Sequence, residues 1–107
     1  MAWLNEPVEI IENSRSSVEK STYDDAHYVG QPFVRHTRTR TNILDKLRYV
    51  GCHYEGAKAK EALLKSAPAT YSEVDTVASG GGQFQVVATR YTEGEWSPWT
   101  IETIGGA

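Results

Sequence analysis

The sequence predicts an α+β protein of one domain, in which an antiparallel sheet with a C-terminal three-strand meander packs on one main helix and carries an extended N-terminal arm. A chain of 107 residues has the length of one ordinary domain. One run of Ala, Lys, Glu and Leu at residues 57–67 is typical of a helix. Runs in which apolar and polar residues alternate, separated by turn residues, predict the strands.

Residues 1–32 are predicted to form an arm or strands ahead of a core at residues 33–107. Residues 8–11 are mostly apolar and β-branched, and residues 18–23 can be extended as well. The polar segment 13–17 between them is typical of a turn or a bulge. Two strands and one long bent arm are both compatible with this pattern.

Residues 33–41 follow a loop at 24–32 and read Phe-Val-Arg-His-Thr-Arg-Thr-Arg-Thr. Their threonine content favours a strand. Because successive side chains of a strand point to opposite faces, Arg38 and Arg40 share one face and the three threonines share the other. We expect a strand with one side in solvent.

Two helical segments are predicted between residues 42 and 68. A helical face, with spacings of four, three and four residues, is formed by Ile43, Leu47, Val50 and Tyr54. Asn42 is a favourable N-cap for a helical stretch near 43–50. The stronger signal lies at residues 55–66, where the Ala-, Lys- and Leu-rich run predicts the main helix and Pro68 ends it.

The C-terminal third predicts three consecutive strands. Residues 71–78 and 83–91 alternate apolar and polar side chains around a glycine-rich turn at 79–82, which is a hairpin pattern. A second turn at 92–95 leads to a last strand at 96–104, where Pro98 favours an edge position. Together these strands make the predicted meander.

The run Trp96-Ser97-Pro98-Trp99-Thr100 is similar to the Trp-Ser-x-Trp-Ser box of fibronectin type III domains in cytokine receptors. In that family the paired tryptophan rings interleave with arginine side chains of a neighbouring strand. The resemblance covers residues 84–100 and implies that Arg90, across the predicted turn, stacks on the rings. A helix at 55–66 has no place in an all-β fibronectin type III domain, and we interpret the box as convergent hairpin packing.

The cationic cluster of the chain consists of Arg35, Arg38, Arg40, Lys46 and Arg48. A solvated sheet face, a protein interface and a phosphate-binding surface are the alternatives. Nucleic acid is the least favoured of them, because no aromatic side chains interleave with the cluster as single-strand binding requires. Together with the aromatic residues of the predicted meander, the interface candidates are Arg35, Arg38, Arg40, Tyr91, Trp96 and Trp99.

No catalytic or metal-binding constellation emerges from the sequence. Cys52 and His53 are adjacent, and adjacent side chains rarely point together as a nucleophile and its base must. The histidines lack the short ligand spacings of metal sites. Residues 24–27, Asp-Asp-Ala-His, are typical of a surface loop, and residues 80–82 lack the Lys-Ser/Thr of a phosphate loop. We predict no enzyme activity, no cofactor and no metal.

Composition narrows the range of partners. The net charge of -3 disfavours a general nucleic-acid binder, which is usually strongly basic. The apolar runs are too short for a membrane span. The first residues lack the basic and then apolar pattern of a signal peptide, which predicts synthesis in the cytoplasm.

These eliminations predict a non-catalytic structural or assembly subunit that acts through protein–protein contacts, in a homo-oligomer or a larger assembly. The alternative is a monomeric ligand- or peptide-binding module that uses an aromatic sheet face. The organisation, a short acidic chain that pairs one helix with a β-meander and carries an extended arm, resembles small virion proteins of tailed bacteriophages. That resemblance implies a tail or head component, located in the virion.

Overall fold

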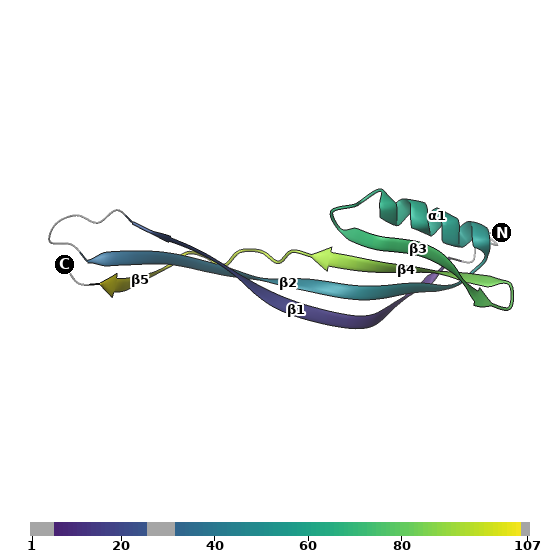
Figure 1. Cartoon of the computed structure of the whole chain (residues 1–107), viewed down its shortest axis with the longest axis horizontal. Coiled ribbons are helices and arrows are strands. Elements are labelled where there is room, and N and C mark those ends of the chain that lie inside the picture. The colour runs from purple at the N-terminus through teal and green to yellow at the C-terminus, as the bar shows by residue number, and fades with distance from the viewer. Residues whose placement is uncertain (1–5, 26–31, 106–107) are drawn as a thin grey trace. The chain divides into compact units, whose positions relative to one another are not determined.

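The computed structural model describes residues 6–25 and 32–105 of the chain. In chain order the elements are β1 (Val8–Asp24), β2 (Phe33–Cys52), α1 (Tyr54–Lys65), β3 (Tyr71–Gly80), β4 (Gln83–Thr92) and β5 (Thr100–Gly105) (Figure 1). The strands form one antiparallel sheet in the order β1-β2-β4-β3, and β5 also pairs with β2. Of the described residues, 67% lie in strands and 13% in the helix.

The predicted α+β class is therefore wrong, because the structure is mostly β, with a single helix among the described residues. Two local predictions account for the error. Residues 43–50, predicted as helical, belong to β2. The last strand, predicted to complete a meander beside the hairpin, pairs with β2 instead.

Residues 43–50 form a strand because their burial repeats every second residue. Asp45, Leu47 and Tyr49 are buried, whereas Leu44, which precedes Asp45, and Lys46, which follows it, are exposed. This segment pairs with β4 in an antiparallel register from Ile43 opposite Thr92 to Tyr49 opposite Val86. A period of two fits a strand with one covered face and does not fit a helix.

β5 pairs in antiparallel orientation with the first part of β2. Phe33 lies opposite Gly105 and Thr37 opposite Thr100 (Figure 1). Residues 93–99, which begin with the predicted second turn, lie in no strand. The chain therefore leaves β4 without turning back on it, and the predicted three-strand meander is a two-strand hairpin.

The hairpin and the main helix are confirmed. β3 and β4 pair with Gly80 opposite Gln83, and the two loop residues Gly81 and Gly82 have φ values of +63° and +76°. A two-residue loop with positive φ at both positions follows the right-handed twist of the strands and strongly favours glycine. The helix α1 matches the prediction at residues 55–66 to within one residue at each end. In the N-terminal region, the described residues form one long strand, β1.

Contacts within the chain group it into two units. Unit 1 contains Met1–Arg15 and Ile43–Thr92, and unit 2 contains Ser16–Asn42 and Glu93–Ala107. Both β1 and β2 contribute residues to each unit. A division of the chain at residue 32 stays a prediction.

Unit 1 has a small apolar core. Its buried apolar residues are Leu47, Tyr49, Cys52, Ala57, Leu64, Val86 and Ala88. Leu47 of β2 lies opposite Ala88 of β4, so their side chains share one face of the sheet. The helix α1, which contributes Ala57 and Leu64, packs against β3 and β4 (Figure 1).

Glu61 joins α1 to β3 on the rim of this core. Thr76 Oγ1 donates a hydrogen bond of 2.8 Å to Glu61, and Lys58 Nζ lies 3.1 Å from the carboxylate. The Thr76 hydrogen bond, followed by that of Lys58, lowers the pKa of Glu61 from 4.5 to about 2. Because the pKa is lower in the folded state, the stabilisation is complete above pH 4.5 and is lost as the pH falls toward 2.

Replacing Thr76 with valine should therefore make the protein less sensitive to acid between about pH 5 and about pH 3. The variant keeps the side-chain shape and lacks the largest cause of the lowered pKa. We expect the free energy of unfolding, measured by urea titration, to fall less steeply with decreasing pH in Thr76→Val than in the unmodified protein. Equal slopes would show that this hydrogen bond does not control the ionisation of Glu61.

Candidate protein-binding surface

Unit 2 holds the tryptophan box beside one face of β2. His36, Arg38 and Arg40 occupy alternate positions of the strand, so their side chains share that face. Ser97 ties the box to the strand. Its N–H donates to the Thr39 carbonyl at 2.8 Å, and its Oγ accepts a hydrogen bond from the Thr39 N–H at 3.0 Å. This exchange of hydrogen bonds keeps the tryptophans next to the arginines.

The guanidinium of Arg38 lies between two indole rings. Its Cζ is 4.5 Å from the centroid of Trp96 and 4.5 Å from the centroid of Trp99. Arg40 Cζ is also 4.5 Å from the Trp96 centroid. All three distances are within the range of cation–π attraction, so cations and rings alternate in the order Arg40, Trp96, Arg38, Trp99.

The stack continues into β1 and returns to β2. Tyr23 meets Trp99 edge to face, with ring centroids 4.9 Å apart, and stacks on His36 at 4.4 Å. His36 Nε2 lies 2.6 Å from a carboxylate oxygen of Asp25. We name these six residues the stacked ladder: Tyr23, His36, Arg38, Arg40, Trp96 and Trp99.

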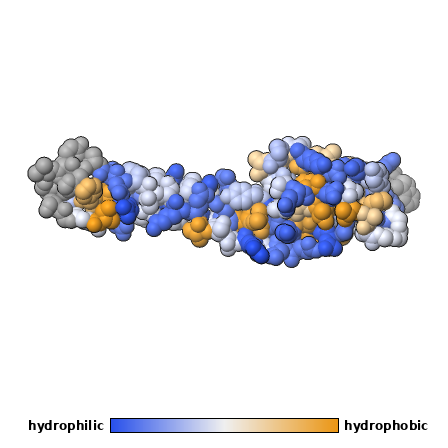
Figure 2. Space-filling view, viewed as in Figure 1, coloured by the Kyte–Doolittle hydropathy of each residue, from blue (hydrophilic) through white to orange (hydrophobic). Residues whose placement is uncertain are grey.

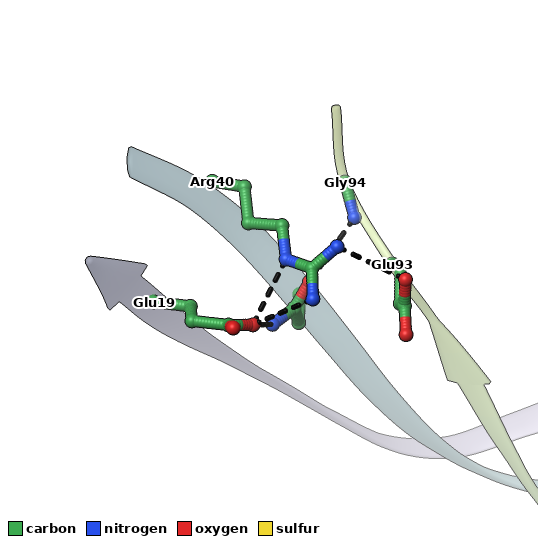
Figure 3. Close-up of polar contacts among 5 residues, drawn as sticks. Glu19, Arg40, Glu93 and Gly94 are labelled. Carbon is green, nitrogen blue, oxygen red and sulfur yellow. Dashed lines mark hydrogen bonds and ion pairs between the residues drawn. The ribbon is translucent and has the colours of Figure 1, made fainter. Parts of the chain in front are cut away.

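Arg40 is neutralised within unit 2. Figure 3 shows its guanidinium between Glu19 of β1 and Glu93, with nitrogen–oxygen distances of 2.8 Å and 3.0 Å. Asn42 Nδ2 also donates to Glu19, at 3.0 Å. The Asn42 hydrogen bond, followed by that of Arg40, lowers the pKa of Glu19. Arg40 is therefore part of a closed network that joins β1, β2 and the segment after β4.

Gly94 lies directly against the backbone of β2. Its N–H donates to the Asn42 side chain at 3.2 Å. A Cβ atom at this position would overlap the carbonyl oxygen of Thr41, far inside van der Waals contact. Asn42, predicted as a helix cap, thus anchors the segment that carries the tryptophan box.

Arg38 differs from the other arginines of unit 2. Arg35 makes two hydrogen bonds to Asp24, of 2.8 Å and 3.2 Å, and Arg40 has the two carboxylates described above. For Arg38, residues 6–25 and 32–105 offer the two indole contacts and no hydrogen bond or ion pair. Its Nε is buried without a hydrogen-bond partner in this part of the chain.

The structure brings together four of the six predicted interface residues, Arg38, Arg40, Trp96 and Trp99. Arg35 lies one residue from the ladder residue His36, so its side chain belongs to the opposite face of β2. Tyr91 belongs to unit 1, where it pairs with Leu44 and is half-buried. The cluster predicted from the cations alone is also divided, because Arg48 pairs with Glu12 in unit 1.

Arg90 does not stack on the tryptophans, as the similarity to the cytokine-receptor box implied. It lies in unit 1, where it is paired with the buried carboxylate of Asp45 at 3.0 Å and lies 3.6 Å from Glu9. The expectation depended on a turn at 92–95 that would bring Trp96 back beside β4. Because the chain continues to β2 instead, Arg38 and Arg40 take the place expected for Arg90.

Sequence reasoning missed two members of the ladder, Tyr23 and His36. A signal for His36 was present, because it stands two and four residues before Arg38 and Arg40 and therefore lies on their strand face. No local pattern pointed to Tyr23, which reaches the ladder from the neighbouring strand β1. The part of the predicted surface loop at residues 26–27, including His27, lies outside the described residues.

Unit 2 exposes large apolar and aromatic side chains, and Figure 2 shows hydrophobic residues in orange at the surface near β5. The exposed ones in its described residues are Val18, Tyr23, Phe33, Trp99, Ile101 and Ile104. Among residues 6–25 and 32–105, the buried apolar residues all belong to unit 1. Within residues 16–25, 32–42 and 93–105, Asn42 is the one buried side chain. This unit therefore has no apolar core of its own in the part described.

Cys52 and His53, the pair considered as a nucleophile and its base, belong to unit 1. Cys52 is fully buried, its Sγ donates to the Phe84 carbonyl at 3.4 Å, and burial raises the pKa of the thiol. His53 is exposed. No group of three or more His, Cys, Asp or Glu residues in the described ranges is arranged to hold a metal ion. The described helix is neither long nor apolar enough to cross a membrane.

The chain was compared with family models, curated proteins and solved structures. No family model matches it, and no significant match was found among the curated proteins or the solved structures.

Proposed function

We propose that the protein is a non-catalytic structural or assembly subunit, and that unit 2 is the part that docks on a protein partner. One observation carries the proposal. In the described part of unit 2, six large apolar or aromatic side chains are exposed and none is buried. A sheet normally needs a covered apolar face to be stable, and an exposed apolar surface of this kind is typical of an interaction site.

The composition of the surface supports a protein as the partner. Trp99 and Tyr23 are 40% and 47% exposed, and Arg38 lies beside Trp99. Trp, Tyr and Arg are the residues most enriched in the energetic centres of protein interfaces. Among the described strands, β1 is an edge strand of the sheet, and it is 17 residues long. An exposed strand edge can pair with a strand of another chain.

Further copies of the same chain are the partner that we propose first, in a homo-oligomer or a larger assembly. The resemblance to small virion proteins of tailed bacteriophages rests on a short acidic chain with one helix and an extended N-terminal arm, and a virion component is our specific proposal for the role. The proposal assigns no reaction to the chain and requires no cofactor.

Sedimentation velocity on the full chain tests self-association. We expect a mass above that of the monomer at high protein concentration, and at least tenfold weaker association for Ile101→Lys. Ile101 is 65% exposed on β5, and burial of an isoleucine in an interface is worth about 1.5–3 kcal/mol, or roughly tenfold or more in affinity.

Leu63→Lys is the matched control, because Leu63 is 63% exposed on α1 in unit 1. Its association should equal that of the unmodified chain. A strict monomer at the highest concentration would contradict self-assembly and favour the peptide-binding module. Equal weakening by both lysines would show that the contact does not involve unit 2.

A further inference from the structure

Among the three arginines of unit 2, Arg38 is the one without a counter-charge from the described residues. The other two arginines of the unit are each held by carboxylates, Arg35 by Asp24 and Arg40 by Glu19 and Glu93. No carboxylate pairs with Arg38 among the described residues. Arginines at partly desolvated positions ordinarily have a charged or hydrogen-bonded partner. Arg38 is therefore able to bind a hydrogen-bond acceptor of a partner molecule.

The indole rings fix how Arg38 would meet that acceptor. Contact with Trp96 and Trp99, both with ring centroids 4.5 Å from Cζ, holds the guanidinium beside two indole rings. Its Nε is buried without a hydrogen-bond partner. The two terminal nitrogens make no hydrogen bond to the described residues and are not buried in this way. A guanidinium whose terminal nitrogens are free presents a planar fork that matches the two oxygens of a carboxylate. Because the side chain is already immobilised, little rotamer entropy is lost on binding.

The surroundings favour a protein carboxylate over a nucleic-acid backbone. The described part of unit 2 contains six acidic residues, Glu19, Asp24, Asp25, Glu93, Glu95 and Glu102, and four basic ones, Lys20, Arg35, Arg38 and Arg40. An acidic excess repels a polyanion, and a single side-chain carboxylate can still pair locally with Arg38. Next to the ladder, Ile101 lies opposite His36 on the same strand face, which adds an apolar contact for the residues that flank the carboxylate.

We infer that Arg38, clamped between Trp96 and Trp99, is the binding site for an Asp or Glu side chain of the docking protein segment. The carboxylate accepts hydrogen bonds from the terminal guanidinium nitrogens, and flanking aliphatic residues contact Trp99 and Ile101. This inference rests on the proposed docking role of unit 2 and names the chemistry of its partner.

Binding of two synthetic peptides to the full chain tests the inference. The first is acetyl-Val-Glu-Val-Glu-Val-amide, and the second has glutamine in place of both glutamates. We expect the glutamate peptide to bind at least tenfold more tightly in a tryptophan-fluorescence titration. In Arg38→Lys this preference should fall to less than about threefold, because lysine keeps the charge and loses the planar fork.

Arg35→Gln is the control for general electrostatics. It removes one positive charge from the same unit outside the ladder and should leave the preference for the glutamate peptide within about twofold. A measurement on the unmodified protein avoids dependence on the folding of Arg38→Lys. The NMR signal of the Arg38 side-chain Nε–H should shift on addition of the glutamate peptide and not of the glutamine peptide.

Each of three results would overturn the inference. They are equal affinity for the two peptides, an unchanged preference for the glutamate peptide in Arg38→Lys, and an Arg38 Nε–H signal that does not shift when the glutamate peptide is added. The self-association measured by sedimentation is independent of these readouts. A chain that assembles through Ile101 and shows no glutamate preference would retain the proposed function and lose only the carboxylate site.

Discussion

Gly94→Ala should release the segment that carries the tryptophan box from β2. A methyl group at this position overlaps the carbonyl oxygen of Thr41, which belongs to the backbone of a paired strand and cannot rotate away. Relief requires the two backbones to separate, which also breaks the hydrogen bond from Gly94 N–H to Asn42. Forcing extra atoms into a close contact typically costs about 1–3 kcal/mol and sometimes more.

The loss should be visible in the ladder, since Trp96 follows Gly94 by two residues. In a Trp3→Phe background, where the two tryptophans of the box are the remaining emitters, Gly94→Ala should shift the emission to the red and increase quenching by iodide. Gly105→Ala is the matched control, because a Cβ there meets Phe33 Cβ at an ordinary 3.6 Å. It should leave the emission unchanged.

Unchanged fluorescence in Gly94→Ala would mean that residues 93–99 do not lie against β2 as described. An equal effect of the two alanines would attribute the change to glycine replacement in general rather than to the close approach at Thr41.

Elements of this fold that depend on local signals could be predicted from the sequence. The Ala-, Lys- and Leu-rich run gave α1 because helix propensity and the stop at Pro68 act within a few residues. The glycine-rich turn gave the β3–β4 hairpin for the same reason. Both elements have partners that are close in the sequence.

The wrong predictions concern strands that pair with residues far away in the sequence, and a segment whose apolar residues fit both a helical period and a strand period. Ile43, Leu47 and Val50 fit a helical period, while the burial of Leu47 and Tyr49 follows a strand period that only the pairing with β4 makes visible. The partner of β5 lies in a segment more than 60 residues earlier, at Thr37 opposite Thr100. No turn chemistry specifies a contact at that separation, so tertiary context decides it.

The candidate surface shows the same division. Strand alternation placed Arg38 and Arg40 on one face, and the tryptophan box indicated arginine stacking; both features meet in the ladder. What the sequence did not give was their combination, because 58 residues separate Thr39 from Ser97, which join the two segments. Arg90 was expected to stack because it is the arginine nearest to Trp96 in the sequence, whereas Arg38 and Arg40 are the arginines nearest to it in space.

Leu47→Ala is expected to destabilise unit 1 strongly. Leu47 is 1% exposed, belongs to a core of seven buried apolar residues among those described, and lies opposite the small side chain of Ala88. Truncation of a buried leucine removes its transfer free energy and leaves a cavity, at a cost of about 2–5 kcal/mol. Domains of this size are stable by roughly 5–15 kcal/mol, so the loss is a large part of the total.

Circular dichroism at the helix band, followed through a urea titration, measures this loss because α1 belongs to unit 1 and packs on its sheet. The control is Leu63→Ala, which deletes the same atoms from a side chain that is 63% exposed on α1, and which should change the free energy of unfolding by less than about 0.5 kcal/mol. The contrast follows from burial alone, since both changes replace leucine with alanine. A cost below about 1 kcal/mol for Leu47→Ala would place Leu47 outside the core and would remove the β2–β4 register that buries it.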